Sequence, residues 1–111
     1  MATLPDVVLS NSVRMPPVQL GTFKTRGTSA VLRSVAAALD AGYTAVDTTA
    51  VYRNHQDIAL ALQSQLATRQ MERRRLFITS KLDPRDHGGE KCGEAIDRAM
   101  EELGVEYLDL F

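Results

Sequence analysis

The stretch AGYTAVDTTAVYRN, residues 41–54, decides the fold of this 111-residue chain. Its apolar centre, Thr44-Ala45-Val46, is the kind of short run that forms a buried strand, and it ends at Asp47. Gly42 stands where the residue after a helix is commonly glycine, and Asn54 is a residue type that favours helix N-caps. The stretch therefore predicts the end of one helix, a strand, and the start of a second helix.

Helical periodicity flanks this strand and returns once more downstream. Before the strand, Thr28 or Ser29 can cap a helix, and a third helix ends at Gly104. The apolar residues at helical spacing are Val31, Leu32, Val35, Ala36 and Leu39 in the first helix, Ile58, Ala61, Leu62 and Leu66 in the second, and Cys92, Ala95, Ile96, Ala99, Met100 and Leu103 in the third.

Further strands are expected on both sides of the quoted stretch. Residues 76–79 form an apolar run that ends at Ser80-Lys81, and residues 105–111 form the next run. Upstream, residues 18–23 are a possible strand. Residues 7–9 and 13–18 are separated by turn-forming residues and predict a hairpin, whose second arm is limited by Pro16-Pro17 to an edge or an irregular segment.

The spacing of the strands predicts the sheet type. Val46, Ile78 and Leu110 lie 32 residues apart, which is the length of a βαβ unit with parallel strands and right-handed crossovers. Periodicity alone allows a barrel or a doubly wound sheet. A doubly wound dinucleotide fold shows G-x-G-x-x-G after its first strand, whereas here Gly21-Thr22-Phe23-Lys24 follows, which favours a barrel.

The predicted strands are too few to close a barrel. We expect one domain, residues 1–111, with an α/β fold that is the N-terminal portion of a parallel (β/α)8 TIM barrel: a β-hairpin, about four strands and three helices. The chain ends inside the apolar run 105–111, so a truncated chain is expected.

Composition narrows the class of protein further. The chain is 44% hydrophobic and 24% charged, with 13 basic against 14 acidic residues and a net charge of −1, so no footprint for nucleic acid or an anionic membrane is expected. Cys92 is the single cysteine, residues 1–10 do not resemble a secretory signal, and no apolar run approaches a membrane span. We expect a cytoplasmic protein, and no cluster has metal-ligand spacing.

Three side chains form a candidate catalytic site. Asp47 and Lys81 follow successive predicted strands, and the carboxyl ends of parallel strands meet at one rim. Tyr52 lies in the loop after Asp47 and can reach the same rim. A lysine ammonium next to a phenol favours the phenolate, so the phenol becomes a competent general acid for a carbonyl oxygen, and an aspartate can hold the lysine in place.

Each of these residues also has a plainer explanation. Asp47 can cap a turn, Lys81 can be a solvated residue at a strand edge, and Tyr52 can be a packing residue. His87 is expected in an exposed loop, Cys92 as a small buried hydrophobe, and the run of three arginines at residues 73–75 as a solvated loop. The joint placement of Asp47, Tyr52 and Lys81 at adjacent strand ends shifts the balance toward function, and both interpretations stay open.

Motifs along most of the chain resemble the aldo-keto reductase family. Residues 41–54 resemble its signature G-[YF]-x-x-[IVF]-D-T-A-x-x-Y-x-N-E, and residues 77–82, FITSKL, resemble the strand that ends in its catalytic lysine. Upstream, residues 9–11, 15–16 and 20–23 resemble L-N-x-G-x-x-M-P and G-L-G-T-[WF]. Downstream, residues 103–110 resemble L-G-x-x-Y-[VIL]-D-L.

The resemblance implies reduction of aldehydes or ketones to alcohols with NAD(P)H, NADPH being favoured and NADH possible. Tyr52 would donate the proton, and Asp47 with Lys81 would tune it. The residues implied for the cofactor are Gly21, Thr22, Phe23 and Asp47, and those for the small-molecule carbonyl substrate are Phe23, Val51 and Tyr52.

Several residues depart from the family pattern. Its catalytic His would fall three residues after Phe111, and His55 and Gln19 replace a usual Glu and Gly, which we expect to affect mainly turn geometry. The chain alone is therefore expected to be inactive and to bind cofactor weakly. Two alternatives stay open: a catalytically silent reductase-like protein that binds nucleotide or a partner, and a half-barrel that self-associates although its full-length parent is a monomer.

Overall fold

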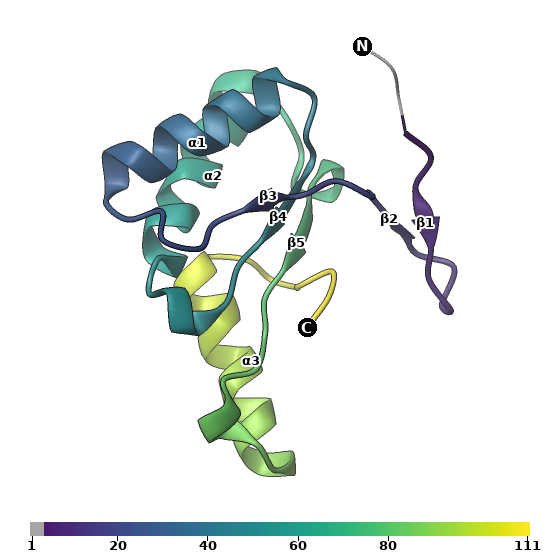
Figure 1. The fold of residues 1–111 in the computed structure, drawn as a ribbon, viewed down its shortest axis with the longest axis vertical. Coiled ribbons are helices and arrows are strands. Elements are labelled where there is room, and N and C mark those ends of the chain that lie inside the picture. The colour runs from purple at the N-terminus through teal and green to yellow at the C-terminus, as the bar shows by residue number, and fades with distance from the viewer. Residues whose placement is uncertain (1–3) are drawn as a thin grey trace.

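Two small sheets and three helices make up residues 4–111, the part of the chain that the computed structural model describes (Figure 1). Residues 1–3, part of the segment expected to lack a secretory signal, lie outside the described residues. The elements are β1 (Val7–Val8), β2 (Arg14–Met15), β3 (Leu20–Gly21), α1 (Thr28–Asp40), β4 (Ala45–Asp47), α2 (His55–Arg69), β5 (Phe77–Thr79) and α3 (Gly89–Leu103), with the 3₁₀ turns η1 (Ala50–Tyr52), η2 (Arg73–Arg75) and η3 (Pro84–Asp86).

The larger sheet is parallel, and its strand order β3-β4-β5 follows the order of the chain. Val46 in the middle strand lies opposite Leu20 on one side and Ile78 on the other. The predicted spacing of Val46 and Ile78 therefore matches the observed register. Each step from strand to strand goes in the same direction, as it does in a barrel.

All three helices cover the same face of this sheet. The core cluster combines residues of every helix with the strand residues Val46 and Ile78, and Figure 1 shows α1 and α2 beside the strands, with α3 below them. Its buried members are Val31, Val35, Val46, Ile58, Ala61, Leu62, Leu76, Ile78 and Leu103. Strands in chain order with their helices on one face are the arrangement that a segment of a barrel wall requires.

The strand predicted for residues 105–111 is not formed as a strand. Leu110 makes a single parallel bridge with Thr79, and the N–H of Asp109 donates to the carbonyl of Ile78 at 2.9 Å. The N–H of Ile78 donates to the Asp109 carboxylate instead of to a backbone carbonyl (2.8 Å). Because this side chain takes the place of a ladder acceptor, the segment follows β5 without continuous pairing.

The predicted hairpin is confirmed, with a shorter second arm. β1 and β2 pair antiparallel, with Val7 opposite Met15 and Val8 opposite Arg14. Residues 13–18 were expected in that arm, but only Arg14–Met15 are strand, because Pro16 and Pro17 have no N–H to donate. The strand expected over residues 18–23 is likewise limited to Leu20–Gly21.

The two ends of α1 give different outcomes for the predicted caps. Gly42 has φ +94°, its N–H donates to the carbonyl of Leu39, and the N–H of Tyr43 donates to that of Ala38, so the glycine C-terminus of α1 is confirmed. The predicted cap by Thr28 or Ser29 is wrong. Gly27 is the N-cap, and the Thr28 hydroxyl donates instead to Asp57 of α2 at 2.8 Å.

Two other predictions need correction. Cys92, expected to be a buried hydrophobe, is half-buried. Arg73 is not part of a solvated loop: its guanidinium donates to the carbonyls of Leu76 and Tyr107 and to the Asp109 carboxylate. The charge of the arginine run suggests exposure to solvent, but Arg73 finds partners in the segment 107–109 that lies beside β5.

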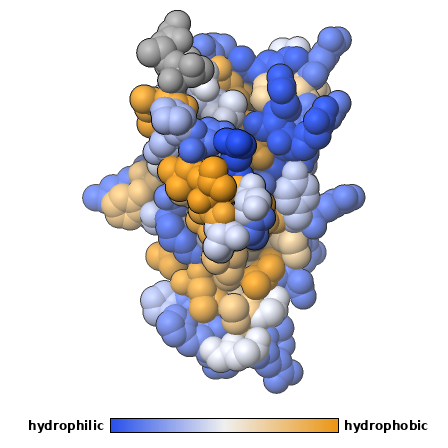
Figure 2. Space-filling view, turned by 90° about the vertical axis from the view of Figure 1, so that its right-hand side faces the viewer, coloured by the Kyte–Doolittle hydropathy of each residue, from blue (hydrophilic) through white to orange (hydrophobic). Residues whose placement is uncertain are grey.

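The outer surface mixes polar and apolar areas. On the side seen in Figure 2, apolar residues gather in a patch along the middle of the molecule, bordered by hydrophilic ones. Exposed large apolar side chains include Val7, Val8, Val18, Leu110 and Phe111. Within residues 4–111, none of the helices is both long and apolar enough to pass through a membrane.

Candidate active site

An ion pair stands at the carboxyl ends of β4 and β5. β4 ends at Asp47, Lys81 follows β5, and the lysine Nζ donates to Asp47 Oδ1 at 2.5 Å. Partial burial on its own would lower the pKa of Lys81, but the hydrogen bond and charge of Asp47, with a smaller contribution from Tyr52, raise it above its ordinary value. The ammonium is therefore kept charged at the rim.

Tyr52 lies over this ion pair, on the turn η1. Its ring centroid is 5.4 Å from Lys81 Nζ, and the left-handed Arg53 (φ +55°) ends the turn directly after it. The ring of Phe23, from the loop after β3, lies 5.2 Å away at an interplanar angle of 52°. The phenol is thus placed between a cation and an aromatic wall, a suitable position for a proton donor.

Asn54 joins the loops that carry these side chains. It was predicted to cap α2 and does occupy the N-cap position, but its side chain makes no capping bond among the described residues. Its amide instead donates to the carbonyls of Thr22 (2.8 Å) and Thr25 (3.0 Å), and its Oδ1 accepts from the Thr48 hydroxyl (3.1 Å). This buried side chain therefore fixes the β3–α1 loop against the β4–α2 loop.

Threonine hydroxyls hold the backbone on both sides of the ion pair. The Thr22 hydroxyl donates to the carbonyl of Asp47 at 2.9 Å, and the Thr49 hydroxyl donates to the carbonyl of Lys81 at 3.3 Å. Thr22 and Thr49 are both buried. The backbone carbonyls of Asp47 and Lys81 are thus each held by a threonine hydroxyl.

The residues implied for a cofactor or substrate lie around this rim. Gly21 ends β3 beside Asp47 in the parallel register, and no described atom lies within 4 Å of a Cβ built on it. Phe23 is 65% exposed and Val51 52% exposed, whereas Thr22 is buried with its hydroxyl already bonded to Asp47. Phe23 contacts Tyr52, while Val51 precedes it on η1 with its side chain in the open.

The backbone at Gly21 is open. A ligand can approach this backbone closely because no side chain stands there, and the exposed Phe23 ring follows two residues later. In residues 4–111, His, Cys, Asp and Glu side chains do not gather in any group of three that could hold a metal ion.

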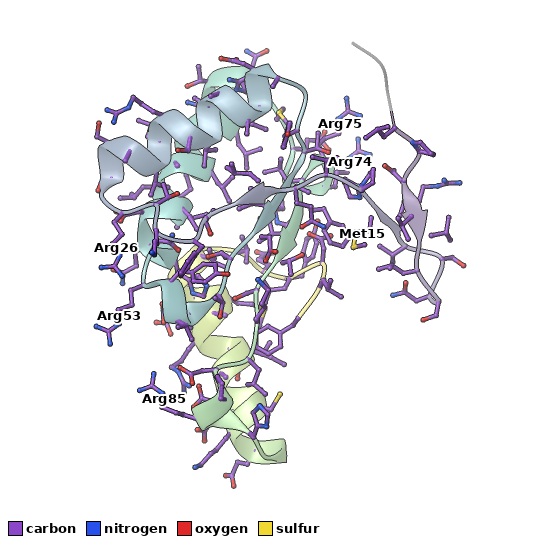
Figure 3. All side chains as sticks on the ribbon, in the orientation of Figure 1. Met15, Arg26, Arg53, Arg74, Arg75 and Arg85 are labelled. Carbon is purple, nitrogen blue, oxygen red and sulfur yellow. The ribbon has the colours of Figure 1, made fainter. Side chains whose placement is uncertain are left out.

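Beyond the ion pair, the rim carries several arginines. Arg26, Arg53 and Arg85 project from the loops after β3, β4 and β5, whereas Arg74 and Arg75 project at the opposite end of the sheet (Figure 3). Arg85 forms hydrogen bonds with Asp83 through its side chain and its backbone N–H, and these hold the pKa of Asp83 at about 2. His87, in the same loop, is exposed as predicted.

Parallel strands wound in one direction, with a carboxylate, an ammonium and a phenol on their carboxyl rim, define an enzyme-like α/β barrel wall. Comparison with known sequences is consistent with this. The sequence model of the aldo/keto reductase family matches residues 17–111. The chain belongs to the aldo/keto reductase family, a family of oxidoreductases.

Individual relatives agree with the family assignment. The chain is 36% identical over 110 residues to the glyoxal reductase of Bacillus subtilis (strain 168), covering 98% of this chain and 38% of that protein. The solved aldose reductase of Schistosoma japonicum superposes with a TM-score of 0.86 at 30% identity, covering 95% of this chain and 35% of that one. An aldo-keto reductase of Bombyx mori, solved in complex with NADP, gives 0.88 at 26% identity and covers 97% of this chain and 37% of that one.

These comparisons also decide the fold class. The chain is an α/β structure of the (β/α)8 barrel class. The doubly wound alternative, which periodicity left open, is thereby excluded. The chain spans 38% of the length of the Bacillus subtilis glyoxal reductase.

Sequence reasoning missed most of the polar side chains behind the rim. Thr48, Ser80 and His55 are each at most 2% exposed, although all three are polar. His55 was expected to affect mainly turn geometry, but it is enclosed between the end of β5 and α3. No pattern in the sequence marks these three residues as buried, because their partners come from other elements of the fold.

Proposed function

We propose that the protein is a nicotinamide-dependent reductase that converts aldehydes or ketones to alcohols, with Tyr52 as the proton donor. The chain spans 38% of the glyoxal reductase to which it is similar, so the activity is proposed for the protein in its full natural length. The observation that carries the proposal is the Asp47–Lys81 ion pair with Tyr52 beside it on the carboxyl rim.

Each residue has one role in this proposal. Tyr52 donates a proton to the carbonyl oxygen of the substrate as that oxygen gains negative charge. Lys81 stabilises the phenolate that remains, and Asp47 keeps the ammonium in place and charged. Phe23 and Val51 line the substrate side of the rim, where their exposed apolar surfaces suit a small carbonyl compound.

The cofactor proposed is NADPH, with NADH as the other possibility. Gly21, Thr22, Phe23 and Asp47 would contact its nicotinamide end, and when bound it would supply hydride to the carbonyl carbon. The open backbone at Gly21 supports this assignment, as does the similarity to the Bombyx mori reductase solved with NADP. Among the described residues, the Thr22 hydroxyl is bonded to Asp47, so Thr22 would contribute through its backbone.

The proposal is tested by following NADPH oxidation at 340 nm by the full-length protein with a reactive aldehyde such as 4-nitrobenzaldehyde. We expect turnover, and we expect Tyr52→Phe to reduce kcat by about 10²–10⁴-fold, the usual contribution of a general acid. NADPH binding, measured by fluorescence, should change little, because the phenylalanine ring still contacts Phe23.

Tyr43→Phe is the matched control. Tyr43 is an exposed tyrosine just before β4, at the amino end of the strand that carries Asp47, so losing its hydroxyl should leave kcat unchanged. Absence of turnover with a range of aldehydes and ketones, despite NADPH binding, would instead support the catalytically silent nucleotide-binding alternative. Retained activity in Tyr52→Phe would assign the proton to another group.

A further inference from the structure

A buried histidine stands directly behind the candidate site. His55 is the first residue of α2 and is 2% exposed, in the space between the end of β5 and α3. A histidine in such a position has lost most of its contact with water, so each ring nitrogen needs a partner in the protein. Its two nitrogens face two different elements.

One nitrogen faces the end of β5. Nε2 lies 3.1 Å from the hydroxyl oxygen of Ser80, the residue directly before Lys81. On the other side, Nδ1 lies 3.4 Å from Glu102 Oε2 on α3, close enough for an ion pair but without an aligned hydrogen bond among the described residues. The chemistry of these partners assigns the protons: Nδ1 carries its hydrogen toward the carboxylate, and Nε2 accepts from the Ser80 hydroxyl.

This contact bears on how Lys81 is held. The backbone N–H of Ser80 donates to Leu110 (3.1 Å), and the Lys81 carbonyl accepts from the Thr49 hydroxyl (3.3 Å). The Ser80 side chain is fixed by His55. Of these three anchors, only the imidazole changes its hydrogen-bonding role when it gains a proton.

A second proton on His55 would turn Nε2 from an acceptor into a donor. The Ser80 hydroxyl could then no longer donate to it and would have to rotate. Burial lowers the pKa of His55, and Glu102 opposes this lowering, so the neutral ring is the form that the fold favours. Glu102 is the charged group that acts on the ring from α3, and the contact from the β5 side is the uncharged Ser80.

We propose that His55 is a positioning residue: neutral, it holds Ser80 and thereby keeps Lys81 directed at Asp47, and in acid this hold is released. The expected effect of His55 on turnover rests on the proposed function. Its tautomer, its titration and its effect on the free energy of unfolding do not.

The effect on stability has a definite sign. Because the pKa of His55 is lowered in the folded protein, its stabilising contribution is complete above the ordinary histidine value of 6.5. The contribution is lost as the pH falls through the lowered folded-state pKa. The free energy of unfolding should therefore decrease on acidification below pH 6.5.

The first experiment is NMR of the full-length protein labelled with ¹⁵N-histidine, recorded in long-range ¹H–¹⁵N spectra from pH 5 to 8. We expect one ring, absent in His55→Gln, to be neutral at pH 7 with its proton on Nδ1 and to titrate below 6.5. Ser80→Ala should raise its pKa, because it removes the hydrogen bond to the neutral form. A proton on Nε2, a charged ring at pH 7, or an unchanged pKa in Ser80→Ala would each overturn the proposal.

The second experiment compares variants by urea unfolding and by kcat at pH 5.5 and 7.5. His55→Gln keeps an acceptor for the Ser80 hydroxyl but has no titrating side chain. The loss of unfolding free energy and of kcat between pH 7.5 and 5.5 should therefore be smaller in this variant than in the wild type. His55→Leu removes the acceptor and should lower kcat at both pH values. His87→Gln, in an exposed loop, is the control and should match the wild type.

The outcomes separate this proposal from the proposed function. If the protein has no reductase activity, the proposed function fails, while the NMR titration and the unfolding measurements still decide the role of His55. If His55→Gln shows the same pH dependence as the wild type in unfolding, the positioning role is wrong even where turnover is normal.

Discussion

Asn54 shows how a single side chain can connect segments that are distant in sequence. Its three hydrogen bonds reach Thr22, Thr25 and Thr48, and the first two lie 32 and 29 residues away. The sequence predicted a helix cap because capping preference is local. The longer-range partners could not be predicted, since they depend on how two loops meet at the rim.

We predict that Asn54→Ala destabilises the protein by about 1–3 kcal/mol, because buried carbonyls and a hydroxyl lose their partner. Urea unfolding measures the change. Asn11→Ala is the matched control: the Asn11 side chain accepts from the N–H of Val13 in an exposed turn, so its loss should cost well under the same amount. Equal losses in the two variants would contradict the role assigned to Asn54.

The charged residues of the site were easier to predict than the polar ones behind it. Asp47 and Lys81 each follow an apolar strand, and the convergence of parallel strand ends is enough to bring them together. Ser80 and His55 carry no comparable pattern, since a serine beside a lysine and a histidine at a helix start both look solvent-exposed in sequence. Their burial depends on contacts between elements, because His55 lies against Ser80 on one side and Glu102 of α3 on the other.

The order of the secondary-structure elements was predicted correctly, but the strands are shorter than predicted. The helices are set by periodic apolar side chains, which are a local property, so α1, α2 and α3 appear where expected. The strands depend on partners. Residues 105–111 have the composition of a strand, but Asp109 uses its side chain on the N–H of Ile78, and only Leu110 pairs.

The glycines of α3 provide a test at the scale of one element. Gly104 ends the helix with φ +67°, and a Cβ there would lie 2.9 Å from Gln63 Nε2. We predict that Gly104→Ala destabilises the protein by about 1–2 kcal/mol, since an L-residue is strained in this conformation. Thermal or urea unfolding measures the change.

Gly93→Ala is the control within the same helix. Gly93 is exposed, and no described atom lies within 4 Å of a Cβ built on it. This variant should be stabilised by about 0.5–1 kcal/mol, because alanine favours the helix interior. Stabilisation by both substitutions would show that Gly104 is not needed for its backbone conformation.

At the scale of the whole molecule, the parallel sheet was predictable, whereas the choice between a barrel and a doubly wound sheet needed the comparison with solved relatives. The strand spacing indicated a parallel sheet, and the missing glycine fingerprint favoured a barrel. Periodicity cannot tell which face of a sheet a helix covers. The core cluster settles that point, because Val31 of α1, Ile58 of α2 and Leu103 of α3 belong to one cluster on one face.

We predict that the 111-residue chain by itself does not oxidise NADPH and binds it weakly. The resemblance implies a catalytic histidine three residues beyond Phe111, and the chain spans 38% of the length of the glyoxal reductase to which it is similar. Fluorescence titration with NADPH, run beside the full-length protein, measures the difference. Tight binding by the 111-residue chain would show that the rim of β3, β4 and β5 is sufficient on its own.

The Asp109 carboxylate also bears on which backbone donors of β5 are left open to another molecule. It accepts from the N–H of Ile78 and from Arg73, so it occupies a donor at the outer edge of β5. An unoccupied donor at a strand edge can pair with a strand of another molecule and start aggregation. Among the described residues, this carboxylate and the backbone of residues 109–110 together occupy the edge of β5 at Ile78 and Ser80, so we expect this edge not to pair with a strand of another molecule.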